Sequence, residues 1–174
     1  MHFAVALACC PTGWIGNEVD LGEVADVEAL AECLRDLSGD TPGPALLLLE
    51  ENDEYVAVVR VDGGAGSLSE PRIFLSDRRA VQGSDVAAML WEDAVAETDD
   101  VDDDGEDGED DDEDESGRPV AEPVGEAALL ADLGVSAADL LALCAEEGLL
   151  PADVIQTICE RVGCADLLDE LREG

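Results

Sequence analysis

Residues 43–61, GPALLLLEENDEYVAVVRV, hold two apolar runs on either side of a short polar stretch, and this arrangement decides the fold. The run ALLLL at residues 45–49 has no polar position, which is typical of a central strand that is covered on both faces. The polar residues ENDE then turn the chain into a second run, YVAVVRV, at residues 55–61. Because alternate side chains of a strand share a face, one face of this run carries Tyr55, Ala57, Val59 and Val61.

The segments before this hairpin predict two strands and a helix. HFAVALAC (residues 2–9) and WIGNEVDL (residues 14–21) are rich in residues that suit strands, and a Pro-Thr-Gly turn separates them. DVEALAECLRDLSG (residues 26–39) has apolar residues at helical spacing. Asp26 is a suitable N-cap for this helix, and Gly39 is suited to its end.

The segments after the hairpin complete the first part of the chain. A glycine-rich loop leads to a short strand, RIFLS (residues 72–76), and SDVAAMLWEDAV (residues 84–95) predicts a helix capped by Ser84. The order is therefore ββαβββα with links of hairpin length. We expect residues 1–96 to form an α+β domain, with a mostly antiparallel sheet covered by helices.

Residues 97–123 predict an acidic linker between two folded parts. Their first 23 positions contain 15 carboxylates and one arginine, so the segment repels itself and has little to bury. We expect a disordered tether that spans about 25–30 Å as a flexible coil.

Residues 124–174 predict a small helical block. Four short helices are indicated, by EAALLADLG, SAADLLALCAEEG, PADVIQTICERVG and CADLLDELRE. The second begins with a capping box from Ser136 to Asp139. A core of about 50 residues is marginal alone, so the block is expected to rest on the first domain, on a second copy in a homo-oligomer, or on a partner.

The charge of the chain limits its partners. The net charge is −37, from 45 carboxylates and eight arginines, with no lysine, and all three parts of the chain are acidic. Direct binding to nucleic acid is not expected, because it requires clustered cations, and an anionic membrane is disfavoured for the same reason. No secretory signal or membrane-spanning segment is recognisable, which predicts a cytoplasmic protein with reduced cysteines.

Several separate segments resemble a known family. FAVAL, GWIGNEVDL, LAECLRDLSGD, GPALLLLEENDEYVAVVRVDG, RIFLSDRRA and LLPADVIQTICERVG follow one another, with an acidic spacer, as in the tRNA adenosine deaminase-associated proteins of actinobacteria. The resemblance covers nearly the whole chain. It implies an accessory role beside the enzyme that converts adenosine to inosine in the tRNA anticodon, and no catalytic residue is carried over.

The residues themselves predict no catalytic, metal or cofactor site. A zinc deaminase needs an H-x-E and a P-C-x-x-C motif, whereas the only histidine is His2, followed by Phe3 and Ala4, and no P-C-x-x-C occurs. The absence of lysine excludes Schiff-base chemistry and the phosphate-binding lysine of the P-loop. The protein is therefore not expected to be an enzyme.

A few residues are candidates for contacts with a partner. The run DDVDDDGEDGEDDDEDE, residues 99–115, matches a calcium loop only in part, because Asp111 stands where that loop has a bidentate glutamate. It is either a solubilising tether or a contact for a basic partner, with Asp110, Asp111 and Asp112 among its residues. Arg72, Arg78 and Arg79 either neutralise nearby carboxylates or form a small basic patch. Trp14 and Trp91 are interface residues if exposed and core-edge residues otherwise.

The sequence therefore predicts a non-enzymatic, acidic, protein-binding protein. The resemblance makes tRNA adenosine deaminase the first candidate partner. The alternative is a polyanionic mimic of nucleic acid that occupies the basic groove of a nucleic-acid-binding protein.

Overall fold

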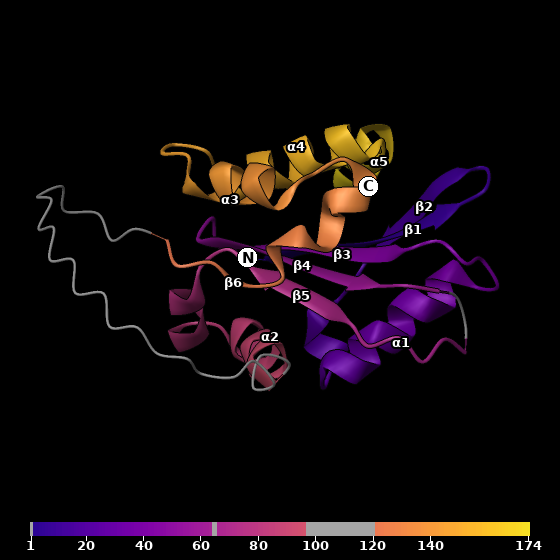
Figure 1. The fold of residues 1–174 in the computed structure, drawn as a ribbon, viewed down its shortest axis with the longest axis horizontal. Helices are drawn as coiled ribbons and strands as arrows, with labels where there is room; N and C mark the ends of the chain where they lie inside the picture. The colour runs from indigo at the N-terminus through magenta and orange to yellow at the C-terminus, as the bar shows by residue number, and fades with distance from the viewer. Residues whose placement is uncertain (1, 64–65, 97–120) are drawn as a thin grey trace, which may run out of the picture.

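The computed structural model confirms the α+β class and describes residues 2–63, 66–96 and 121–174. A single antiparallel sheet in the order β2-β1-β3-β4-β5-β6 carries helices on both faces (Figure 1). The order of the first seven strands and helices is ββαβββα, as predicted.

The central hairpin is formed by β3 (Ala45–Glu51) and β4 (Tyr55–Val61). Its register pairs Ala45 with Val61 and Glu51 with Tyr55. The turn between the strands places Asn52 and Asp53 at φ values of 52° and 57°, a left-handed conformation that Asn and Asp tolerate better than most residues. All seven residues of β4 are buried, and so are the first five of β3, which confirms that the hairpin lies at the centre of the sheet.

The remaining strands extend the hairpin on both sides. β1 (His2–Cys10) pairs with β3, and β2 (Gly13–Glu18) pairs with β1 and forms one edge of the sheet. On the other side β5 (Arg72–Leu75) pairs with β4. A two-residue strand, β6 (Val124–Gly125), pairs with β5 and was not predicted. A Cβ at Gly125 would lie 2.1 Å from the Ile73 carbonyl oxygen, so only glycine allows this close approach.

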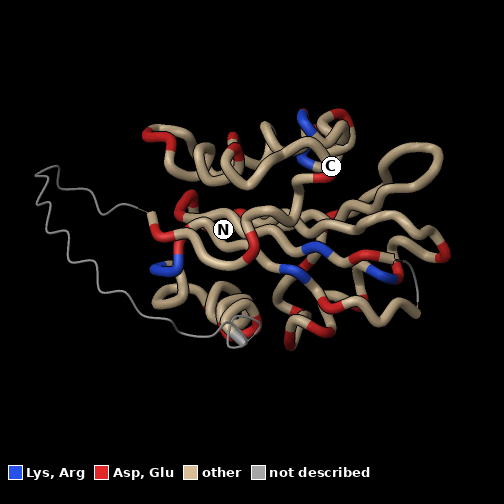
Figure 2. Tube along the Cα trace, viewed as in Figure 1, with Lys and Arg blue, Asp and Glu red and all other residues tan. Residues whose placement is uncertain are grey.

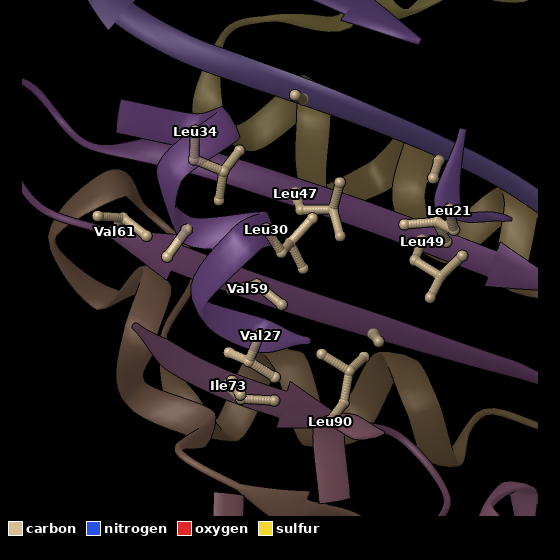
Figure 3. Close-up of a cluster of buried hydrophobic side chains, with 14 of the residues drawn as sticks. Leu21, Val27, Leu30, Leu34, Leu47, Leu49, Val59, Val61, Ile73 and Leu90 are labelled. Atoms are coloured by element: carbon tan, nitrogen blue, oxygen red, sulfur yellow. The ribbon is translucent and has the colours of Figure 1, made fainter. Parts of the chain in front are cut away.

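The first face of the sheet is covered by helices that follow strands along the chain. These are α1 (Val27–Ser38) and α2 (Asp85–Ala96), with two short 3₁₀ helices, η1 (Leu21–Glu23) and η2 (Arg78–Gln82). Figure 3 shows leucines of α1 lying over valines and leucines of the strands. Asp26 caps α1 by accepting a hydrogen bond from the Ala29 N–H, and Ser84 accepts one from the Ala87 N–H, as the sequence predicts.

The second face is covered by the C-terminal helices. They are η3 (Ala127–Leu133), α3 (Ala137–Ala145), α4 (Pro151–Val162) and α5 (Ala165–Glu173), and Figure 1 places α3, α4 and α5 on the side of the sheet opposite α1 and α2. The predicted cap at Ser136 is present, because its side chain accepts a hydrogen bond from the Asp139 N–H. Of the three supports considered for these helices, the structure shows the first: they pack on the sheet, and their core includes Leu48, Val58, Leu140, Ile155 and Leu168.

Candidate functional site

The three arginines predicted as a candidate patch lie at two ends of one strand. Arg72 is the first residue of β5, whereas Arg78 and Arg79 lie beyond its last residue, in η2. A strand advances about 3.3 Å per residue, which separates the two positions. The structure therefore does not bring the three guanidinium groups into one cluster.

Each of these arginines has a carboxylate partner. Arg72 Nη1 lies 3.1 Å from Glu126 Oε1, and its Nη2 donates to the Leu129 carbonyl oxygen at 3.1 Å. Arg78 pairs with Glu122. Arg79 Nε donates to Asp77 Oδ1 at 2.9 Å. The positive charges are thus neutralised by nearby groups of the same chain.

The Asp77 carboxylate is the centre of the pairing in η2. Burial raises its pKa, but hydrogen bonds from the side chain and backbone of Arg79 and from the Glu122 N–H lower it more, so the pKa of Asp77 lies below its ordinary value. Asp77 also caps η2, because its side chain accepts a hydrogen bond from the Arg79 N–H. Its role here is structural, since both functions hold the chain after β5 in place.

The most buried ionic network in this region was not singled out from the sequence. Arg60 of β4 is only 5% exposed, on the second face of the sheet. Its Nε donates to Asp62 Oδ1 at 2.9 Å, and its Nη2 donates to Asp132 Oδ2 at 2.8 Å. Its Nη1 donates to the Leu129 carbonyl oxygen at 2.6 Å. The signal in the sequence was an arginine on the same strand face as Val56 and Val58, where a charge needs a buried partner.

The Arg60 network joins the sheet to η3. The hydrogen bond from Arg60 lowers the pKa of Asp132, which belongs to η3, more than burial raises it. Asp132 and Leu129 both follow the acidic segment in the chain, whereas Arg60 precedes it. The network therefore ties the C-terminal helices to the central hairpin.

All seven described arginines are engaged within the chain. Six form ion pairs, which include Arg35 with Glu28 at 2.8 Å and Arg161 with Asp139 at 3.2 Å. The seventh, Arg172, donates to the Ala152 carbonyl oxygen at 3.2 Å and lies over the Phe3 ring, 5.2 Å from its centroid. The same described ranges contain 30 carboxylates, so most carboxylates have no cationic partner. Figure 2 shows acidic positions on both helical layers and few basic positions.

The two tryptophans lie at the margins of the two layers. Trp14, in β2, is half-buried and packs against the core of the second face. Trp91 is half-buried in α2, next to the fully buried Leu90. The residues Asp110, Asp111 and Asp112 lie outside the described residues, as does most of the predicted linker.

The six cysteines are free thiols, and none of them forms a disulfide. Burial raises the pKa of Cys144 to about 11, which keeps it protonated at neutral pH and makes it a poor nucleophile. Cys159 and Cys164 lie together in the second-face core, and both are buried.

One surface hollow has acidic side chains in its lining. It has a volume of about 530 Å³ and lies between α1 and the loop before β5, and its lining includes Glu28, Glu32, Asp36 and Glu70. Residues 2–63, 66–96 and 121–174 contain no cluster of three histidine, cysteine or carboxylate side chains placed to hold a metal ion. In these ranges no single helix is long and apolar enough to cross a membrane, although η3 and α3, as a bent pair, meet the length and composition requirement together.

Fold and surface together define a class of protein: an acidic α+β protein with one sheet covered on both faces and with its described arginines engaged internally. The chain matches the model of the Rv3753c-like tRNA adenosine deaminase-associated protein family over residues 2–165, and it belongs to that family. This finding confirms the resemblance seen in the sequence. No curated protein and no solved structure matches the chain.

Proposed function

We propose that this protein is a non-enzymatic accessory protein that binds tRNA adenosine deaminase and meets tRNA only through that enzyme. The family description, which associates its members with this enzyme, supports the choice of partner. Since the substrate of the enzyme is tRNA, we propose that both proteins act in the cytoplasm.

One observation carries the proposal that the contact is with protein rather than with RNA. Binding to RNA phosphates needs free, clustered cations, whose contacts release counterions from the nucleic acid. Six of the seven described arginines are ion-paired, and Arg172 is held by Ala152 and Phe3. The surplus of carboxylates instead complements a basic protein surface, such as one that binds tRNA.

The test is co-purification of the full chain with tRNA adenosine deaminase from the same organism, followed by a deamination assay on tRNA. We expect a complex that survives purification and changes the deamination rate. The absence of both a complex and a rate change would contradict the proposal. Saturable binding of bare tRNA by the purified chain at physiological ionic strength would contradict it as well.

The second candidate function is the polyanionic mimic. It is favoured by the run at residues 99–115, where 14 of 17 positions are carboxylates. A variant that replaces this run with a Gly/Ser segment of the same length separates the two functions. An adaptor that binds through its folded layers keeps most of its affinity, whereas a mimic loses nearly all of it and shows a steep dependence on ionic strength.

A further inference from the structure

One edge of the sheet is a strand with a single neighbour. Within the described part of the chain, β2 pairs with β1 on one side and has no strand on the other. It lies at the margin of the molecule, in the hairpin that projects from the sheet (Figure 1). An edge of this kind presents unpaired backbone N–H and C=O groups, which can pair with a strand of another chain.

Two backbone hydrogen bonds at the ends of β1 show which backbone groups of β2 point outward. The Cys9 N–H donates to the Pro44 carbonyl oxygen at 3.0 Å, and the Val19 N–H donates to the Ala4 carbonyl oxygen at 2.9 Å. Backbone groups in antiparallel strands alternate in direction, so odd residues of β1 bond to β3 and even residues bond to β2. The register then leaves three residues of β2 with backbone groups that face away from β1, namely Trp14, Gly16 and Glu18. Of these groups, the Glu18 carbonyl oxygen accepts a hydrogen bond from Asn17 Nδ2 at 3.0 Å.

The edge has few of the features that usually block strand addition. The strand GWIGNE contains no lysine, arginine or proline, and Ile15 is 42% exposed. At its centre, a Cβ on Gly16 would lie 2.6 Å from the Ala6 carbonyl oxygen and 2.7 Å from Leu7 Cδ2. Only glycine fits there, which leaves bare backbone in the middle of the edge.

The surroundings of the edge select for a basic occupant. Glu18 is exposed, and α5 packs beside β2, with Leu167 next to Gly16. The exposed carboxylates of α5 are Asp166, Asp169, Glu170 and Glu173. Its only arginine, Arg172, is held against Phe3. The register places Ile15 opposite Ala8 on the first face of the sheet, whereas Gly16 and Glu18 lie on the second face with α5. An incoming strand therefore meets Ile15 on one of its faces and the carboxylates on the other.

A second copy of this chain is a poor match for the same edge. A twofold antiparallel pair centred on Gly16 would satisfy the backbone groups, with Trp14 opposite Glu18. It would also bring together two chains of net charge −37, neither of which has a lysine to compensate. Charge complementarity selects a basic strand over a second copy.

We propose that β2 is a docking edge for an extended, basic segment of a partner protein, which adds to the sheet as a seventh strand with Ile15 as its apolar contact. The identity of the partner, and only that, rests on the proposed function, in which tRNA adenosine deaminase supplies the segment. Backbone hydrogen bonds to Trp14, to Gly16 and to the Glu18 N–H provide the affinity, and the carboxylates of Glu18 and α5 provide the preference for lysine and arginine.

The first test does not need the deaminase. Amide hydrogen exchange of the full chain is measured by NMR with a capped peptide of alternating lysine and valine, and with a glutamate–valine peptide as control. With the basic peptide at about ten times its dissociation constant, exchange at Trp14, Gly16 and Glu18 should slow about tenfold. Unchanged exchange at these amides overturns the proposal. Protection that grows with protein concentration and without peptide also overturns it, because the occupant is then a second copy.

The second test compares two variants in binding to the deaminase. Ile15→Lys places a cation on the edge, and Leu150→Lys makes the same change at a leucine that is 50% exposed. Leu150 precedes Pro151, which lines a hollow with Asp77 and Ala121 on the β5 side of the molecule, away from β2. We expect Ile15→Lys to weaken binding at least about tenfold, the effect of roughly 1.4 kcal/mol, and Leu150→Lys to leave it unchanged.

The two tests separate the two proposals. If the wild-type chain does not bind the deaminase but the basic peptide protects the β2 edge, the proposed function fails and the docking edge stands. If the chain binds the deaminase and Ile15→Lys binds as tightly as wild type, the docking edge fails and the proposed function stands.

Discussion

The helices that cover the two faces of the sheet differ in where they lie along the sequence. On the first face α1 and α2 come before β6, each after a strand and a short 3₁₀ helix, whereas every helix of the second face comes after β6. Burial is nevertheless the same on both sides, since Leu47 on the first face and Leu48 on the second are both fully buried. The C-terminal helices thus bury one of the two faces of the sheet, although the acidic segment separates them from strands β1 to β5 in the sequence.

The two faces also differ in how a buried arginine is used. Arg35 of α1 joins Glu28 of its own helix to the Ser69 carbonyl oxygen in the loop before β5. Arg60 on the second face instead joins β4 to Asp132 and Leu129 of η3. The first arginine stabilises a loop, whereas the second links the central hairpin to the C-terminal layer.

The largest expected effect comes from removing one leucine from each face. Leu47→Ala and Leu48→Ala should each lower the free energy of unfolding by about 2–5 kcal/mol, because both remove a fully buried side chain and leave a cavity. Chemical denaturation followed by circular dichroism measures both. Equal losses in a single transition indicate that the two layers fold as one unit.

The same pair of variants tests the division of the chain into units at residues 1–96, 97–123 and 124–174, which stays a prediction. A loss below about 1 kcal/mol for Leu48→Ala, or two separate transitions, would show that the C-terminal block is a separate unit whose docking adds little. Leu47→Ala is the matched control, because it changes the neighbouring residue of the same strand on the opposite face.

An intermediate effect is expected from the two buried arginines. Arg60→Ala removes the charged hydrogen bonds that link β4 to Asp132 and Leu129, so the free energy of unfolding should fall by about 2–3 kcal/mol, although Arg72 still donates to the Leu129 carbonyl oxygen. Arg35→Ala should lower it by about 1 kcal/mol, because its partner Glu28 is largely exposed. Thermal and chemical denaturation measure the difference.

Arg161→Ala is the surface control for this comparison. Arg161 and Asp139 are both substantially exposed, so removing their ion pair should change stability by less than about 1 kcal/mol. Equal losses for Arg60→Ala and Arg161→Ala would contradict the structural role assigned to the Arg60 network.

The elements that could be predicted from the sequence are those set by local chemistry. Hydrophobic periodicity indicated five strands, and the caps Asp26, Ser84 and Ser136 are formed by contacts three residues apart. The strand β6 could not be predicted, because two residues carry no periodicity and Val124–Gly125 is defined by its pairing with β5. The order of the strands and the cover of the second face likewise depend on contacts between distant segments.

The contacts of the candidate site residues could not be predicted either, because they also join segments that are distant in the sequence. Arg72, Arg78 and Arg79 are close in sequence, yet β5 separates them, and their partners include Glu122 and Glu126 from the other side of the acidic segment. Ion pairs across 44 or 54 positions have no local signature. Arg60 had a weaker signal, a charge within an apolar strand, but the sequence could not show that its partner would be Asp132.

The smallest expected effect concerns two aspartates, Asp132 on the second face and Asp93 on the first. Their charges should change the free energy of unfolding in opposite directions. The hydrogen bond from Arg60 lowers the pKa of Asp132, so its ionised form stabilises the fold above the ordinary pKa of about 3.8. That stabilisation is lost as the pH falls through the lower pKa of the folded state. Burial, with Glu28 and Glu70 nearby, raises the pKa of Asp93 on α2, so its charge destabilises the fold above the raised pKa.

Substitution to asparagine should therefore act in opposite directions at neutral pH. Asp132→Asn should lower the free energy of unfolding and Asp93→Asn should raise it, each by less than about 1 kcal/mol, because water screens both groups and the Asp132 side chain is 59% exposed. The Asp93→Asn difference should disappear as the pH falls through the raised pKa of Asp93, before it reaches the ordinary value of about 3.8. The Asp132→Asn difference should persist to lower pH and shrink as the pH falls from the ordinary value through the lowered pKa of Asp132. Unfolding free energies measured from pH 3 to pH 7 would contradict the comparison of the layers if both variants shifted stability in the same direction.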